Sequence, residues 1–146
     1  MPDTPRTWQL LTAMQASMAL ILQANGYYTD AGAYVTLEPT QIPDGEPALV
    51  ALVLENLGRA TDPALARRGR LATVVAIIKV PTVGDDRQIR LHEAIQDVER
   101  CFDAQQGRFA VGLQWPQFVD SKVIPPVDGL GWIGAEVRFQ SHVTLR

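Results

Sequence analysis

The residues able to carry out acid–base or metal chemistry are few in this sequence. Its two histidines are His92 and His142. His92 begins the run HEAIQ, which follows a zinc-protease helix motif until Gln96, where zinc would need a second histidine. His142 follows Ser141, and because neighbouring residues of a strand point to opposite faces, these two cannot form a nucleophile–base pair. Neither histidine therefore predicts a catalytic or zinc site.

A pair of carboxylates could perform acid–base work, and one pair has a suitable spacing. Glu93 and Asp97 are four residues apart on the same predicted helix. Arg90 lies three residues before Glu93, and Arg100 lies three residues after Asp97. This spacing is typical of opposite charges that pair on a helix surface. We therefore interpret the four residues as a solvated helix face.

The sequence has two further candidate sites: one cysteine, which could act as a nucleophile, and one glycine-rich run, which could bind a dinucleotide. Cys101 adjoins an apolar helical stripe and has no histidine at a neighbouring helical position, so it predicts a small core residue. The run 129–134, GLGWIG, matches the G-x-G-x-x-G pattern of dinucleotide sites. It stands at the entrance of a strand, however, without the strand before and helix after that such sites need. Its glycines predict a tight turn and a bulge. We expect no enzyme, no metal and no cofactor.

The overall charge limits the classes of partner. The formal net charge is −3 at pH 7, whereas domains that bind nucleic acid are usually basic because they neutralise phosphates. Hydrophobic residues make up 47% of the chain, which is ordinary for a globular protein. No run approaches the roughly 20 apolar residues that span a bilayer. We expect no membrane partner and a cytoplasmic location at synthesis.

The one notable charge cluster falls in residues 56–70. Glycine and proline punctuate this segment, so the sequence predicts a long, mobile, exposed loop. Two hypotheses remain open for it: a solvated loop, or a docking loop that orders on a neighbouring subunit or near nucleic acid. The loop carries four arginines: Arg59, Arg67, Arg68 and Arg70.

The elements that position these residues are predicted to be two helices and five strands. Apolar residues at three- and four-residue spacing indicate helices. Apolar runs and alternation indicate strands. The order α-β-β-(long loop)-β-α-β-β predicts the α+β class, a mostly antiparallel sheet with the two helices packed on it, in one domain spanning 1–146. The helices are placed at 4–23 and 86–102, the strands at 33–37, 48–55, 71–80, 109–115 and 132–145, and an irregular segment at 116–131.

The ends of the first helix and the faces of the last strand are predicted in more detail. Thr4 can cap the first helix with Pro5 at its first position, and Gly26 can end it in a left-handed conformation. Its apolar stripe includes Trp8 and Met14. In the last strand, one face is apolar and the other, bearing residues 136, 138, 140, 142 and 144, meets water or a partner.

The arrangement as a whole resembles the tail terminator, or tail completion, proteins of long-tailed bacteriophages. The resemblance covers nearly the whole chain. After the amphipathic first helix come GYYTDAGAYV at 26–35, PALV opening a strand at 47, and the strand VVAIIKV at 74–80. The helix at 91–102 and a long amphipathic last strand complete it.

The resemblance implies a structural virion protein at the neck end of the tail, assembled in the host cytoplasm. Its partners would be further copies of itself in a ring, usually a hexamer, the tail tube protein and the head–tail connector protein. The ring would cap the tube and end its polymerisation, and DNA would pass through it without specific recognition. The family has no catalytic residues, and its interfaces would fall on long loops and sheet edges. Here the expected interface residues are Arg59, Arg67, Arg68, Arg70, Glu136, Arg138, Gln140 and His142.

Three alternatives remain open from the sequence. A head–tail connector or another minor tail protein would share the size, the charge and the lack of catalytic motifs. A small ligand-binding or hydrolytic α+β domain would need a pocket with convergent polar groups. A nucleic-acid-binding module would use the arginines of residues 56–70, against the acidic net charge.

Overall fold

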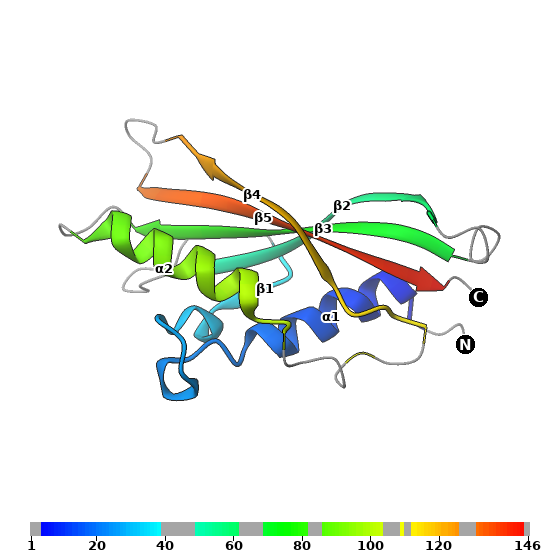
Figure 1. Ribbon diagram of the computed structural model, residues 1–146, viewed down its shortest axis with the longest axis horizontal. Helices are drawn as coiled ribbons and strands as arrows, with labels where there is room; N and C mark the ends of the chain where they lie inside the picture. Colours follow the sequence, from blue (N-terminus) through cyan, green and yellow to red (C-terminus); the bar gives the residue numbers. More distant parts are fainter. Residues whose placement is uncertain are drawn as a thin grey trace.

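The elements of the chain form one twisted sheet with two helices on one of its faces (Figure 1). The computed structural model describes residues 4–38, 49–61, 69–81, 86–103, 109, 112–125 and 131–144. Within them the chain forms α1 (Arg6–Met18), η1 (Gln23–Asn25), η2 (Ala31–Ala33), β1 (Val35–Thr36), β2 (Leu49–Arg59), β3 (Gly69–Pro81), α2 (Arg87–Arg100), β4 (Gln117–Ile124) and β5 (Trp132–Thr144).

The five strands lie in the order β1-β2-β3-β5-β4. Only the short β1 runs parallel to its neighbour β2, and the other neighbouring pairs are antiparallel. The pairing of β3 with β5 runs without interruption from Gly69 opposite Thr144 to Pro81 opposite Trp132. The predicted α+β class, with a mostly antiparallel sheet and two main helices, is confirmed.

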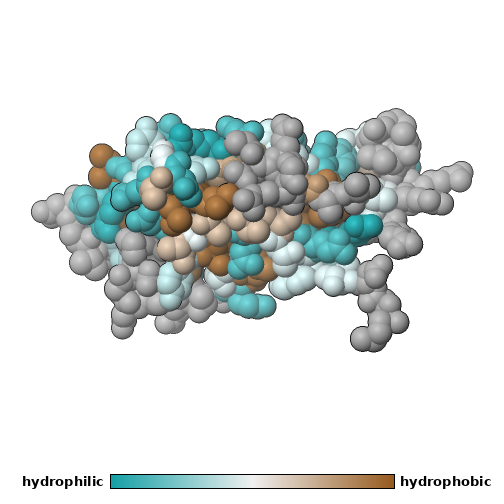
Figure 2. Space-filling model, turned by 90° about the horizontal axis from the view of Figure 1, so that it is seen from below, coloured by the Kyte–Doolittle hydropathy of each residue, from teal (hydrophilic) through white to brown (hydrophobic). Residues whose placement is uncertain are grey.

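The helix-bearing face of the sheet forms the core. Its strand residues include Val74, Val137 and Phe139, all fully or almost fully buried. The ring of Phe139 meets the ring of Phe102 edge to face at 4.8 Å, a favoured geometry for an aromatic pair. Seen from below, apolar residues gather in the middle of the surface (Figure 2). Truncation of Phe139 to alanine would cost about 3–5 kcal/mol of stability.

The first helix is shorter than predicted. Pro5 occupies the N-cap position with no side-chain cap, so the prediction of a Thr4 cap is wrong. The helix ends at Met18, and Gly26 takes φ 90° after the separate 3₁₀ turn η1 instead. Met14 is buried as predicted, but Trp8 is 40% exposed. Leu10 is fully buried in its place, because the face of α1 that meets the sheet is rotated from the predicted stripe.

The second helix follows the sequence prediction closely. Its buried residues include Leu91, Ala94 and Val98, which recur at three- and four-residue spacing along one face. Asp86 stands at the N-cap but makes no side-chain cap bond and instead pairs with Arg90 at 3.2 Å. The helix packs across β3 and β5.

The predicted loop at 56–70 is wrong where the structure describes it. β2 continues to Arg59 and β3 begins at Gly69, so the two strands form a long hairpin. Leu57 opposes Ala72, which keeps an apolar pair on the helix-bearing face. Glycine and arginine at the hairpin end obscured this continuation in the sequence. Residues 62–68 lie outside the described residues, so the predicted mobility there stays a prediction.

The fourth strand lies later in the chain than predicted. The expected strand at 109–115 is wrong, since Leu113 makes only an isolated bridge to Val143. Gly112, at φ 94°, breaks any extended run there. The strand that completes the sheet is β4, inside the segment predicted to be irregular. The first predicted strand, at 33–37, is reduced to the two residues of β1.

No helix among the described residues is long and apolar enough to cross a bilayer.

Candidate subunit interface

The polar face of β5 carries four of the residues predicted to contact partners. Glu136, Arg138, Gln140 and His142 alternate with buried residues, as predicted, and lie on the face away from the helices. No helix among the described residues covers that face (Figure 1). Whether these residues contact a partner stays a prediction, but the structure gives each of them a contact within the chain.

Arg138 is the centre of an ion-pair cluster on this face. Its guanidinium lies 3.0 Å from a carboxylate oxygen of Glu55 on β2, 2.7 Å from Glu136 on the same strand and 3.8 Å from Asp120 on β4. Hydrogen bonds to Glu55 and then Glu136 raise the pKa of Arg138 above its already high ordinary value. Three carboxylates therefore surround one guanidinium. The cluster therefore links β2, β4 and β5 through their side chains.

His142 fastens the segment before β4 to β5. Its Nδ1 lies 2.9 Å from the side-chain oxygen of Gln114, and its Nε2 lies 3.1 Å from the hydroxyl of Thr61. The backbone of Gln114 also donates to the His142 carbonyl oxygen. Ser141 is buried on the opposite face, where its hydroxyl donates to the Gln114 carbonyl oxygen. The prediction that Ser141 and His142 face apart is confirmed, and both have structural contacts.

Two of the predicted arginines meet at the end of the β2–β3 hairpin. Arg59 is paired in register with Arg70, so two like charges stand opposite each other. Arg70 donates to the carbonyl oxygen of Gly69, and Arg59 is exposed. This end of the hairpin is therefore basic. Arg67 and Arg68 lie outside the described residues.

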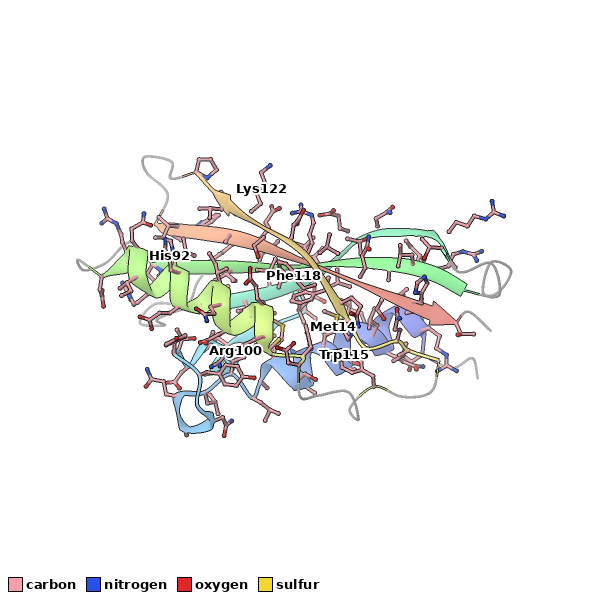
Figure 3. The ribbon with its side chains drawn as sticks, viewed as in Figure 1. Met14, His92, Arg100, Trp115, Phe118 and Lys122 are labelled. Carbon is pink, nitrogen blue, oxygen red and sulfur yellow. The ribbon has the colours of Figure 1, made fainter. Side chains whose placement is uncertain are left out.

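β4 is an edge strand that the sequence prediction missed. Among the described strands it pairs with β5 alone, and most of its residues are exposed. Phe118, Val119 and Val123 are each between 43% and 53% exposed. Phe118 and Lys122 are both carried by this strand in Figure 3. β-branched and aromatic residues between Pro116 and Pro125 were the available signal for this strand.

Asp97 is not part of a solvated helix face, so that interpretation is wrong. Its carboxylate is fully buried and accepts hydrogen bonds from the backbone N–H groups of Tyr28 (3.1 Å) and Thr29 (2.8 Å). The hydroxyl of Thr29 donates to it as well, at 2.7 Å. The carboxylate therefore anchors the loop that follows α1 to α2, through groups nearly 70 positions apart in the chain.

Arg100 reinforces this anchor from the surface. It lies 3.8 Å from Asp97, donates to the carbonyl oxygen of Gly26, and stacks over the ring of Tyr27 at 4.7 Å. Burial raises the pKa of Tyr27, and the neighbouring Cys101 adds to the rise. Figure 3 places Arg100 at the end of α2 near this loop and His92 toward the other end of the helix. Asp97 and Arg100 together hold the loop that follows α1 against α2.

A small cavity lies between the same loop and the start of α2. Its volume is about 320 Å³, and Tyr28, Asp30, Ile89 and Glu93 contribute to its lining. None of the described residues that line it is a cysteine, serine or histidine. Among the described residues, no group of three or more His, Cys, Asp or Glu side chains is placed to hold a metal ion. Cys101 is buried, as predicted, and burial raises the pKa of its thiol well above the ordinary value.

Comparison with known proteins adds one similarity of fold. No family model matches the sequence, and no curated protein matches it. Among solved structures, the chain is similar to a chain described as "Virion of native gene transfer agent (GTA) particle". The TM-score is 0.58 and the sequence identity 20%, over 94% of this chain and 98% of the other. The two proteins therefore share a fold along nearly their whole lengths.

Proposed function

We propose that this protein is a structural component of a phage-like virion, in which copies form a ring that caps the tail tube. The observation that carries the proposal is the similarity of fold, end to end, to a chain of a gene transfer agent virion. Because both chains are covered almost completely, the similarity is one of whole proteins rather than of a shared substructure. The resemblance to tail terminator proteins supports the same setting.

The contacts of the polar residues favour a structural role over catalysis. Asp97, Arg138 and His142 are three of the groups that an active site could use. Each is held by residues of its own chain: backbone amides for Asp97, carboxylates for Arg138, and Gln114 for His142. A catalytic group is instead expected to face a pocket that admits substrate. We therefore propose that the protein is not an enzyme.

The proposed action is steric. A closed ring would bind the last ring of tube subunits and present a surface that further tube subunits cannot join. Its other surface would meet the head connector, and DNA would pass through the centre without specific recognition. A ring of this kind uses head-to-tail contacts that rotation closes. The protein would then belong to the neck end of the tail in the virion and to the host cytoplasm during assembly.

A second candidate is a head–tail connector or another minor tail protein. The gene transfer agent similarity supports it equally, because the description of that chain gives no position within the particle. Co-purification separates the two: a terminator stays with tail tubes that lack heads, whereas a connector stays with heads that lack tails.

The test of the proposal is the length of the tails made without this protein. Deletion of its gene in the particle-producing host should give tail tubes of widely varied, excessive length, and restoring the gene should return one uniform length. Tubes of normal length after deletion would refute termination. Light scattering of the purified protein, with negative-stain images of the same fractions, would show whether a ring forms before it meets the tube.

A further inference from the structure

We infer that the ring closes through its sheets: residues 121–124 of β4 in one copy pair antiparallel with the exposed end of β2, residues 56–59, of the next copy. This inference deepens the proposed ring and rests on it. The occupant of the β4 edge is thus a second copy of this chain, and the contact is head to tail.

The first edge is β4 itself. About half of the N–H and C=O groups of an edge strand point away from its single partner and can join another strand. Natural edges are usually protected by charge or by bulges. β4 has a bulge at Val119 and one lysine, Lys122, yet Phe118 and Val123 remain half exposed. An edge so apolar is expected to be covered by a partner.

The second edge is the far part of β2. On its outer side β1 pairs only with Val50 and Ala51. From Leu52 to Arg59, no described strand lies beside it on that side. The strand is buried through Leu52, half-buried at Val53 and Leu54, and largely exposed beyond Leu54. Leu57 is 40% exposed in this part.

The directions of the strands allow the two edges to pair. Each neighbouring pair from β2 through β3 and β5 to β4 is antiparallel, so β4 runs opposite to β2. Rotation about an axis along the strands leaves strand directions unchanged. In a ring built by that rotation, β4 therefore meets β2 of the next copy in the antiparallel sense, which gives straight hydrogen bonds.

The side chains of the two edges match in kind and in face. Val123 opposes Ala135 and Leu57 opposes Ala72, and both alanines are in the core. Val123 and Leu57 therefore lie on the helix-bearing face, which stays on one side in a continuous sheet. Setting these two residues opposite each other brings apolar surface together at the joint.

The same register brings opposite charges together. With Leu57 opposite Val123, Arg59 falls opposite Ser121. The hydroxyl of Ser121 donates to the carboxylate of Glu99 on α2, at 2.5 Å. The exposed Arg59 of one copy would then lie beside Glu99 of the next, and the basic hairpin end would gain an acidic partner. Every copy uses both of these stretches, so a closed ring leaves neither residues 121–124 nor residues 56–59 free.

Cysteine cross-linking in the particle-producing host tests the pairing. The double variant Leu57→Cys with Val123→Cys, treated with a short bismaleimide, should give a ladder of covalent oligomers on a denaturing gel. Each single variant should remain monomeric, because a head-to-tail joint never brings two copies of one position together. The matched control pairs Leu57→Cys with Ile89→Cys, since Ile89 is 59% exposed but lies on α2, and should give no ladder. Cys101 is buried and does not interfere.

Tail length measured in the same cells separates this inference from the proposed function. No ladder from particles with tails of controlled length would overturn the edge pairing and leave termination standing. A ladder in a strain whose tail length is indifferent to the protein would support the pairing and refute termination.

An exchange of charges tests the pairing of β4 with β2 if the cysteine variant does not fold. Arg59→Glu alone should lower the assembled fraction at least about tenfold, because it sets two carboxylates side by side. Adding Glu99→Arg should restore assembly. Equal assembly of the wild type and both variants would overturn the pairing.

Discussion

Replacement of Asp97 by asparagine should destabilise the protein strongly, although the side chain keeps its shape. The two carboxylate oxygens accept three hydrogen bonds, two of them from backbone N–H groups of Tyr28 and Thr29. Asparagine has one acceptor oxygen and one NH2 group, so one of those backbone donors must face another donor whichever way the amide turns. A hydrogen bond to a charged group contributes about 1.5–3 kcal/mol, and an unsatisfied donor costs a similar amount. We expect a loss of about 3 kcal/mol, or roughly 6–12 °C in Tm for a domain of this size.

Chemical denaturation followed by circular dichroism measures this loss, and hydrogen exchange locates it. Exchange at the Tyr28 and Thr29 amides should accelerate more than exchange in β3 or β5, because the anchor of this loop is removed first. Glu93→Gln is the matched control: it makes the same change one turn earlier on α2, at a partly exposed site, and should stay within about 0.5 kcal/mol of the wild type. A loss below about 1 kcal/mol for Asp97→Asn would refute the view that this carboxylate holds the loop.

Three further substitutions test buried groups by denaturation. Burial raises the pKa of the Cys101 thiol well above 9.0, so the stability of the wild type should fall as the pH rises above 9, where the unfolded chain releases this proton first. In Cys101→Ala this decline between roughly pH 9.5 and 10.5 should be smaller by up to about 1.4 kcal/mol per pH unit. Equal slopes for the two proteins would contradict this. A Cβ on Gly32 would overlap backbone atoms at the end of α1, so Gly32→Ala should cost at least about 3 kcal/mol, whereas Gly131→Ala has open space and should cost less than about 1. The hydroxyl of Ser17 is buried without a partner among the described residues, so Ser17→Ala should stabilise the protein by about 1 kcal/mol, whereas Ser141→Ala breaks a hydrogen bond and should destabilise it by a similar amount. A loss of stability in Ser17→Ala would show that this hydroxyl has a partner after all.

Elements with one buried face were predictable from the sequence. The alternation of β5 and the stripe of α2 follow directly from burial, because every buried position there packs against the core. β4 could not be found in this way, since it is exposed on most of its length and exists because it pairs with β5. The alternation at 109–115 predicted a strand wrongly, because these residues have buried contacts without strand pairing. Phe109 and Trp115 contact Phe102, but no ladder joins them to the sheet.

The polar groups of the candidate interface were found by the sequence, but their contacts were not. Arg138 was expected to contact a partner subunit. In the structure it lies among carboxylates from β2, β4 and its own strand. Those contacts depend on the strand order, in which β5 lies between β3 and β4. Asp97 was placed on a solvated surface because local spacing gave it an arginine, whereas its main partners are backbone amides of a distant loop. The contacts of Arg138 and Asp97 are therefore set mainly by residues that are distant in the sequence.

The place of β5 within the sheet has a consequence for synthesis on the ribosome. β5 follows every other described element in the chain, yet it is the described strand that lies between β3 and β4 and joins them. Until it has been translated, β4 has no strand to pair with and the core lacks Val137 and Phe139. A nascent or truncated chain therefore has a β2 edge but no ordered β4 edge. In the proposed ring, such a chain could pair with a neighbour on one side only. Each copy could therefore join a closed ring only after its β5 has been completed.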